Sequence, residues 1–537
     1  MSQDTSTQKP KQNVYDNVYF GGLLLLVLGL LFSKPLLSIA EGTLALSLML
    51  RGQFFSRIKG FFMQRENIVL CSFYLLLVVG MLHTQDVKAG LDELRIRLPL
   101  LVLPILLLAS PPLSKTRTEQ VLNLFIAAVT VSTLISTGVL LGIGHKNIQD
   151  IREISLFMSN IRLALLVVLA FLLTAYRALI AKSDQSLLLR TTLLLLCLWF
   201  FAFLLLLESL TGILLLLFIA SCLGIYKLWS GRNTLSRLTL AASLIALPMA
   251  LTYYFNRVTS SVTAQEKVDF ATLDSLTPEG NRYEHRAADL QFENGHPVWV
   301  YVCKYELERD WNKRSNIDFL GKDEKGQYIE YTLIRYLASK GLRKDASGVK
   351  ALSDGDLRSI ERGITNVQDQ QVSSISTRVR QTTWEVKNFL AGGNPSGHST
   401  TQRLEFWRTA LGIISANTWI GVGTGDAKTA MDAEYIRNQS PLAAENRLMP
   451  HNEYLLAAVM LGIPGLLLLL LSLLYPVYAN RKNLRYGYVV FCMLAILSML
   501  TEDTLGTQVG VTFYAFFNAF FLSRIRHAAE GPTAYGI

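Results

Sequence analysis

Apolar residues along the chain gather in long runs. A helix needs about 20 apolar residues to cross the roughly 30 Å hydrocarbon layer of a membrane. The pattern therefore predicts an all-α polytopic membrane protein with about 12 transmembrane helices. Ser33-Lys34-Pro35 separates the first two runs, which are short and could instead form a re-entrant pair, leaving 11 spans. The candidate spans lie at about 18–34, 36–50, 67–83, 97–111, 120–142, 162–181, 188–207, 210–229, 236–255, 453–478, 486–501 and 506–524.

One long polar segment interrupts the apolar pattern. It divides the chain into an N-terminal bundle of about nine helices at 1–255, a polar segment at 256–450, and about three C-terminal helices at 451–537. The polar segment is long enough for a domain with its own core. Its pattern is mixed and mainly helical, with a helical tract at 328–341 and a strand-like run, Val298-Trp-Val-Tyr-Val-Cys303.

Basic residues are distributed unevenly between alternate loops. With the N-terminus inside, the inner loops hold 19 Lys and Arg residues and the short outer loops hold seven. Because basic loops stay cytoplasmic, both termini are predicted to be cytoplasmic and the polar segment periplasmic, in a bacterial inner membrane. The net charge of +10 is largely this topology signal, so nucleic-acid binding is not expected.

The sequence contains few cysteines and no pattern of cysteines that would bind a metal. Of the five cysteines, only Cys303 lies in the polar segment, so no disulfide can form within that segment and no Cys-based metal site is expected. Two carboxylates, Glu41 and Glu208, lie within or beside predicted spans. An intramembrane carboxylate is either a functional group or a protonated or paired structural one, and both interpretations stay open for each.

The stretch Met449-Pro-His-Asn-Glu-Tyr-Leu455 lies where the polar segment ends and an apolar helix begins. His451 can accept or give a proton near neutral pH, and free amides at a helix start favour a bound anion. The alternative is a helix cap or an interface residue. Asn452 is a candidate supporting residue, and Glu502 or Asp503, on the same predicted side, could orient the imidazole.

A helix is predicted to start at Thr400. Ser399 and Gln402 have the spacing of a capping box, and Leu404, Trp407, Leu411 and Ile414 would share one apolar face. Arg403 and Arg408 on this helix, together with Arg162 at a predicted membrane boundary, are candidates for binding a diphosphate, because arginine is always charged and donates bidentate hydrogen bonds. The two helix residues are five apart, roughly 140° around the axis, so Arg403 is preferred.

A glycine-rich run, Gly421-Val-Gly-Thr-Gly-Asp426, follows that helix. It contains no Lys and follows a helix rather than a strand, so a nucleotide phosphate loop is not expected and a tight turn is the default. Asp426 is a further candidate supporting residue.

These motifs together resemble the C-terminal signature of the O-antigen ligase and O-antigen polymerase superfamily. The segments that carry the resemblance are Arg403-Leu-Glu-Phe-Trp407, Gly421–Asp426, His451-Asn-Glu-Tyr-Leu455 and Leu461-Gly-Ile-Pro-Gly465, with Ser159-Asn-Ile-Arg162 and Glu502-Asp-Thr-Leu-Gly506 resembling the Bacteroidetes version. One position departs: the family often has Ser-Arg-Thr-Gly where this chain has Ser209-Leu-Thr-Gly212.

The resemblance implies a metal-independent, cofactor-free, inverting glycosyltransferase. Such an enzyme takes a glycan from undecaprenyl diphosphate on the periplasmic face and ligates it to a hydroxyl of lipid A–core. His451 would be the catalytic base, and Arg403 and Arg162 would bind the diphosphate. An O-antigen polymerase or a protein O-oligosaccharyltransferase would share this donor, and a lipid-linked glycan transporter is the alternative from another class.

Overall fold

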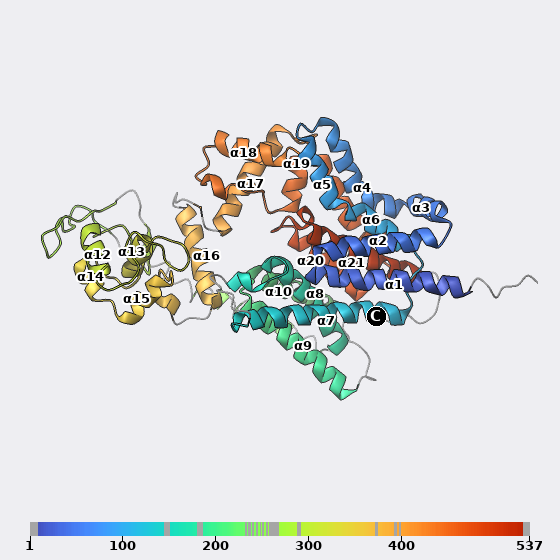
Figure 1. Cartoon of the computed structure of the whole chain (residues 1–537), viewed down its shortest axis with the longest axis horizontal. Coiled ribbons are helices and arrows are strands. Elements are labelled where there is room, and N and C mark those ends of the chain that lie inside the picture. Colours follow the sequence, from blue (N-terminus) through green and yellow to red (C-terminus); the bar gives the residue numbers. More distant parts are fainter. Residues whose placement is uncertain are drawn as a thin grey trace, which may run out of the picture. The chain divides into compact units, whose positions relative to one another are not determined.

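The computed structural model describes residues 9–143, 151–179, 186–230, 268–286, 291–370, 374–390, 395–396 and 399–529, and isolated positions between 234 and 256. The chain forms two compact units. The membrane unit comprises Met1–Lys146, Arg152–Cys222 and Gln402–Ile537, and the polar unit comprises Asn147–Ile151 and Leu223–Thr401. Figure 1 shows that helices are the main regular elements of both units, with long loops between them in the polar unit.

The membrane unit contains helices long and apolar enough to cross a bilayer. Seven such helices occur in the described part of the chain, which confirms a multi-pass helical membrane protein. The total of about 12 stays a prediction, and most of the run at 236–255 lies outside the described residues. The seven are Val14–Phe32, Arg65–His83, Lys115–Leu140, Asn160–Leu179, Leu187–Leu206, Leu210–Trp229 and Glu453–Ala479.

Most of the predicted apolar runs coincide with helices of the membrane unit, which also has shorter helices between them. They are α1 (Lys9–Phe32), α2 (Lys34–Leu50), α3 (Phe54–Met63), α4 (Arg65–Gly80), α5 (Val87–Arg97), α6 (Pro99–Leu108), α7 (Lys115–Leu140), α8 (Asn160–Leu179), α9 (Leu187–Leu206), α10 (Leu210–Ser230), α17 (Ser399–Ala416), α18 (Ala427–Arg437), α19 (Glu453–Ala479), α20 (Tyr486–Ser498) and α21 (Gln508–Ala529). Short 3₁₀ turns lie at Met81–His83, Ile151–Ile154, Ala444–Asn446 and Thr504–Gly506.

The first two apolar runs form successive helices packed side by side (Figure 1). A Cβ on Gly22 would meet Leu44, and one on Gly29 would meet Leu37, so the glycines allow close, antiparallel approach. Ser33 is the N-cap residue of α2, and a proline in its first turn fits the helix start.

The predicted span at 97–111 is wrong in its limits. Instead, α5 ends at Arg97 and the ten-residue α6 begins at Pro99, with Leu98 between them in helical conformation. Pro99 has no N–H to donate and is tolerated at a helix start, so a break falls there. The helical region therefore begins at Val87, before the apolar run. Its first helix, α5, is polar, so the apolar pattern did not reveal it.

Backbone hydrogen bonds join the loop after α17 to a kink in α19. Gly462 has φ 68°, and this distortion frees carbonyl groups of the preceding turn. The amide of Val422 donates to the carbonyl of Val459, and Gly423 donates to Met460, both at 2.9 Å. In return, Ile463 donates to Thr418 at 2.8 Å. The predicted interruption of this span is confirmed. The glycine run is an extended loop that is hydrogen-bonded along the kink rather than a tight turn.

The same loop also holds the connection between α4 and α5. Both carboxylate oxygens of Asp426 accept backbone N–H groups, from Gln85 at 2.7 Å and from Asp86 at 2.8 Å. Thr424 Oγ1 donates to the carbonyl of Leu77 at 2.7 Å. This loop therefore fixes α4, α5 and α19 to one another.

The polar unit has a small helical core. Buried side chains around Trp311, Leu333 and Ile360 form it. Its elements are β1 (Phe292–Glu293), β2 (His296–Pro297), α12 (Lys304–Trp311), α13 (Ile329–Ser339), α14 (Ala346–Lys350), α15 (Asp354–Glu361), a 3₁₀ turn (Val367–Gln370) and α16 (Ser374–Leu390). The predicted helix at 328–341 is confirmed by α13.

The predicted strand at 298–303 is wrong. β1 and β2 form a two-residue antiparallel hairpin just before it, and the 298–303 run makes only isolated bridges at Val302. Tyr301 has φ 59°, which a strand cannot accommodate. The run is apolar because it crosses the core, with Val298, Val300 and Val302 all buried.

Gly462→Ala is expected to destabilise the membrane unit. A methyl group there would lie 2.6 Å from the Thr418 carbonyl oxygen, and the left-handed backbone costs a non-glycine residue roughly 1–2 kcal/mol before any clash. The measurement is thermal unfolding of purified protein in detergent. Gly42→Ala is the matched control, because nothing lies within 4 Å of that position; equal melting temperatures for the two variants would contradict the role of the kink.

Candidate functional site

Four separate segments of the membrane unit meet around His451. They are the start of α8, the first turns of α17, the residues before α19, and the connection between α20 and α21. Three hydrogen bonds link the second and third of these segments to the fourth: Arg403 to Glu502, His451 to Asp503, and Glu453 N–H to the Met499 carbonyl. The site therefore lies at the end of the bundle where α8, α19 and α21 begin, called here the site end.

The backbone around His451 is fixed on both sides. Trp407 Nε1 donates to the Pro450 carbonyl at 3.0 Å. The side chain of Asn452 caps α19 by accepting from the Leu455 backbone amide. Its Nδ2 donates to the Leu500 carbonyl at 3.0 Å. His451 itself has φ 48°, a conformation that non-glycine residues rarely adopt and that is found disproportionately at functional sites. This confirms the geometry of a capped helix start.

The imidazole of His451 is oriented by Asp503. Nδ1 of His451 donates to Oδ1 of Asp503 at 3.2 Å, and the Phe406 ring lies 5.9 Å away, centroid to centroid. An ionised carboxylate only accepts hydrogen bonds, so the proton of the neutral imidazole lies on Nδ1. Nε2 is then left with its lone pair, as a general base requires.

Electrostatics support a basic imidazole and an ionised partner. The hydrogen bond to Asp503 raises the pKa of His451, while burial works in the opposite direction. For Asp503, burial alone would raise the pKa, but the hydrogen bond from His451 and the charge of Arg162 hold the pKa below its usual value. His451 is about one-third exposed, so Nε2 can reach a reactant.

Arg403 reaches the same loop as His451. Its guanidinium lies 2.6 Å from Oε1 of Glu502, and both side chains are largely buried. Burial raises the pKa of Glu502, and the charges of Arg403 and His451 oppose that rise. The pair is therefore a partly buried ion pair that an incoming anion would have to rearrange.

The predicted helix is confirmed by α17, which begins at Ser399 rather than Thr400. Of the residues predicted to share one apolar face, Leu404 and Leu411 are exposed, whereas Phe406, Ala410 and Ile413 are buried. In a membrane protein an apolar face can meet lipid instead of protein, so hydrophobicity alone does not identify the packed side.

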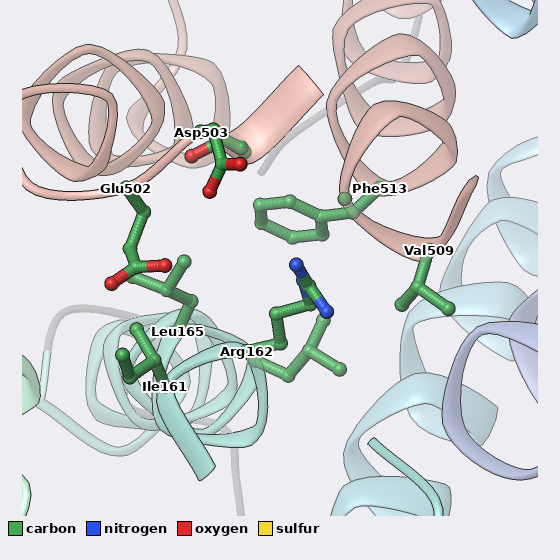
Figure 2. A pocket seen from close by; sticks show the side chains of 10 residues that line it. Ile161, Arg162, Leu165, Glu502, Asp503, Val509 and Phe513 are labelled. Atoms are coloured by element: carbon green, nitrogen blue, oxygen red, sulfur yellow. The ribbon is translucent and has the colours of Figure 1, made fainter. Parts of the chain in front are cut away.

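Arg162 lines a pocket between α8, the α20–α21 connection and α21. The pocket contains about 380 Å³ of space not filled by atoms, part of it open to solvent. Figure 2 shows the guanidinium pointing toward Phe513, with Glu502 and Asp503 beside it. Within the described chain, no acceptor lies within hydrogen-bond distance of this guanidinium, which leaves Arg162 available to bind an anion. The other lining residues are Ile161, Leu165, Leu166, Thr504, Val509 and Gly510.

Two other predicted residues lie apart from this cluster. Arg408 is 73% exposed, and its ion pair is with Glu405 on its own helix. Asp426 accepts hydrogen bonds from the backbone amides of Gln85 and Asp86 and therefore has a structural role.

The two intramembrane carboxylates lie elsewhere. Glu208 lies at the break between α9 and α10 with φ 52°, and Ser209 caps α10 by accepting from the Gly212 amide. The segment that departs from the family pattern is therefore a helix start. Glu41 lies in α2, with Oε1 buried and without a hydrogen-bond partner among the described residues.

A buried ion pair behind His451 was missed by the sequence reasoning. Arg97 is one of the seven basic residues assigned to the short outer loops. It is 1% exposed and pairs with the fully buried Glu453 at 3.7 Å and with Glu93. Oε2 of Glu453 accepts the Leu505 amide at 2.9 Å, which positions the loop that carries Asp503. The available signal was Glu453 itself, a carboxylate one residue inside a long apolar helix.

Three side chains of the site could also contact a cation. His451, Glu502 and Asp503 bring possible ligand atoms within 4.8 Å of one another. However, Glu502 is already paired with Arg403, and the positive charges of Arg403 and Arg162 would repel a metal ion. The two arginines therefore disfavour a cation at this group.

Arg97→Met is expected to lower the free energy of unfolding by about 3–5 kcal/mol, because it leaves the buried Glu453 carboxylate without its partner. Adding Glu453→Gln should recover much of the loss, since the neutral amide can still accept from Leu505. Arg95→Met is the matched control: this side chain is 76% exposed, and a change within about 0.5 kcal/mol is expected. Equal unfolding midpoints for the Arg95 and Arg97 variants would contradict the role of the buried pair.

Comparison with known protein families gives an independent identification. Residues 362–470 match the family model described as O-antigen ligase, a range that includes Arg403 and His451 but not Arg162 or Asp503. A search of curated proteins finds no match. The family supports a function of the O-antigen ligase or polymerase type in a membrane. The chain thus carries a domain of the O-antigen ligase superfamily, as the sequence motifs predicted.

Proposed function

We propose that this protein is a metal-independent, inverting glycosyltransferase of the bacterial inner membrane. It transfers a glycan from undecaprenyl diphosphate to a hydroxyl of lipid A–core on the periplasmic face. The observation that carries the proposal is the placement of one orientated imidazole, His451, beside two arginines, Arg403 and Arg162, at the site end. The distribution of Lys and Arg supports a periplasmic location for this end.

The reaction requires a base and a site for the leaving group. Nε2 of His451 takes the proton of the acceptor hydroxyl, whose oxygen attacks the anomeric carbon of the donor sugar. The bond from that carbon to the diphosphate oxygen breaks, and the lipid diphosphate leaves with the bonding electrons. Attack opposite the leaving group inverts the anomeric configuration. Asp503 stabilises the imidazolium that forms, because it already accepts from Nδ1.

The arginines stabilise the negative charge that develops on the leaving group. Arg162 is available for this without breaking any contact within the described part of the chain. Arg403 must exchange Glu502 for a phosphate oxygen, and the buried, raised-pKa Glu502 carboxyl can take up a proton when that exchange occurs. Diphosphate stabilisation by fixed donors in a largely buried site supplies the function that a metal ion has in many glycosyltransferases.

His451→Ala is expected to lower the rate of glycan transfer by at least about 100-fold, because a general base typically contributes a factor of 10²–10⁴. The measurement is the conversion of undecaprenyl-diphosphate-linked glycan to glycosylated lipid A–core by purified protein, with and without a chelator. Arg437→Gln is the matched control, since this arginine is 64% exposed and pairs with Glu434 on its own helix.

Two outcomes would contradict the proposal. Near-normal transfer by the His451 variant would exclude the base assignment, and loss of activity on adding chelator would exclude metal independence. A product in which glycan repeats are joined to each other, with lipid A–core unused, would instead identify a polymerase.

The rate of transfer is expected to rise with pH, with a midpoint above the usual imidazole value of about 6.5. The base must be unprotonated, and the Asp503 hydrogen bond raises the pKa of His451, so protonation persists to higher pH. Asp503→Asn removes that charge and should move the acidic limb of the pH–rate profile down by about 1 pH unit. Profiles of wild type and variant that overlap after scaling would show that Asp503 does not act through the imidazole.

A further inference from the structure

A second pocket lies at the opposite end of the membrane unit from His451. It is formed where α8 and α21 end and where α7 and α20 begin, and it contains about 420 Å³ of space not filled by atoms, part of it open to solvent. Three arginines line it: Arg177, Arg485 and Arg524. The remaining lining residues are mostly apolar or aromatic, namely Leu122, Leu173, Tyr176, Tyr486, Gly487, Tyr488, Phe521 and Ile525.

Three positive charges lie close together at this pocket. Arg177 and Arg485 lie close enough to Arg524 to repel it, and Glu119 is a carboxylate that acts on both Arg177 and Arg524. Within the described residues, no hydrogen-bond acceptor or carboxylate pairs directly with Arg524.

The polar groups around the pocket are mostly engaged elsewhere. Arg177 donates to Oδ1 of Asn123, which holds its guanidinium in place. The hydroxyl groups of Tyr486 and Tyr488 bond to the Leu172 carbonyl and to Asn518. The rings of Tyr176 and Tyr486 stack at 4.3 Å, so the wall is rigid. The arginines are therefore the groups that a ligand would meet.

The close packing of the wall depends on a glycine. A Cβ at Gly487 would lie 2.9 Å from the ring of Phe521, so any side chain at this position would displace that ring. Basic residues at helix ends usually extend outward along the bundle surface to reach lipid headgroups. Here they converge on one hollow between four helices, which is the arrangement of a binding site for a specific anionic group.

We propose that this pocket binds the headgroup of an anionic phospholipid, with a preference for a lipid that carries two phosphates. Three guanidinium groups on one hollow offer enough donors for two phosphates, and guanidinium groups bind phosphate oxygens bidentately. The apolar residues next to the arginines suit the adjoining acyl chains. Basic pockets between transmembrane helices on the cytoplasmic side are a known mode of phospholipid recognition, and the predicted topology places this pocket on that side.

The test is thermal unfolding of purified full-length protein in detergent, with added cardiolipin, phosphatidylglycerol, phosphatidylcholine or inorganic phosphate. Cardiolipin at saturation should raise the melting temperature by at least about 3 °C, because a ligand that binds only the folded state stabilises it. Phosphatidylglycerol should act more weakly, and phosphatidylcholine and inorganic phosphate should have little effect. Arg524→Gln should weaken the apparent cardiolipin affinity at least about tenfold.

Arg190→Gln is the matched control, since Arg190 is an exposed arginine in the first turn of α9 and does not line the pocket. An equal response of the Arg524 and Arg190 variants would overturn the proposal. A shift of the same size with inorganic phosphate would indicate a free-anion site and overturn the lipid assignment, and an equal shift with phosphatidylglycerol would overturn the two-phosphate preference. If Arg524→Gln does not accumulate, native mass spectrometry of the wild type and of Arg177→Gln decides: retained cardiolipin on the first and not the second supports the site, and equal retention overturns it.

Discussion

The geometry of the site depends on how the start of α19 is tied to the connection between α20 and α21. The Glu453 amide donates to the Met499 carbonyl, and the Glu453 carboxylate accepts from the Leu505 amide. These bonds bring His451 and Asp503, 52 residues apart in the sequence, within hydrogen-bond distance. Burying a carboxylate to make such a tie is costly unless a cation is near it, which explains the equally buried Arg97. The ion pair and the imidazole are therefore parts of one assembly.

Positively and negatively charged side chains alternate within the site. Asp503 faces His451, and Glu502 faces Arg403, while Arg162 has the pocket in front of it (Figure 2). Because the neighbouring helices provide apolar walls, these charges are weakly screened and act strongly on one another. An anion entering beside Arg162 would compete with Glu502 for Arg403. The resting site is thus prearranged for an anionic group without holding an exposed excess of charge.

The sequence predicted the features that depend on local pattern. Long apolar runs predicted the helices, and the order of short motifs predicted the family. It could not tell which face of a helix packs against protein: the residues predicted to share one apolar face of α17 include Leu404 and Leu411, which are exposed. It also failed where a residue acquires its role from a distant partner. Arg97 looked like one more loop arginine, and only its pairing with Glu453 distinguishes it from the exposed Arg95.

The same limit applies at the other end of the bundle. Arg177, Arg485 and Arg524 each satisfy the bias of basic residues toward cytoplasmic loops, so in the sequence they carry a topology signal and nothing more. Their convergence on one hollow cannot follow from that bias, since topology requires only that a charge stay on one side of the membrane. Mutual repulsion opposes the gathering of three like charges, and Glu119 is one carboxylate that offsets it. Such an arrangement is stable where an anion completes it, and in a membrane the anion always at hand is a phospholipid headgroup.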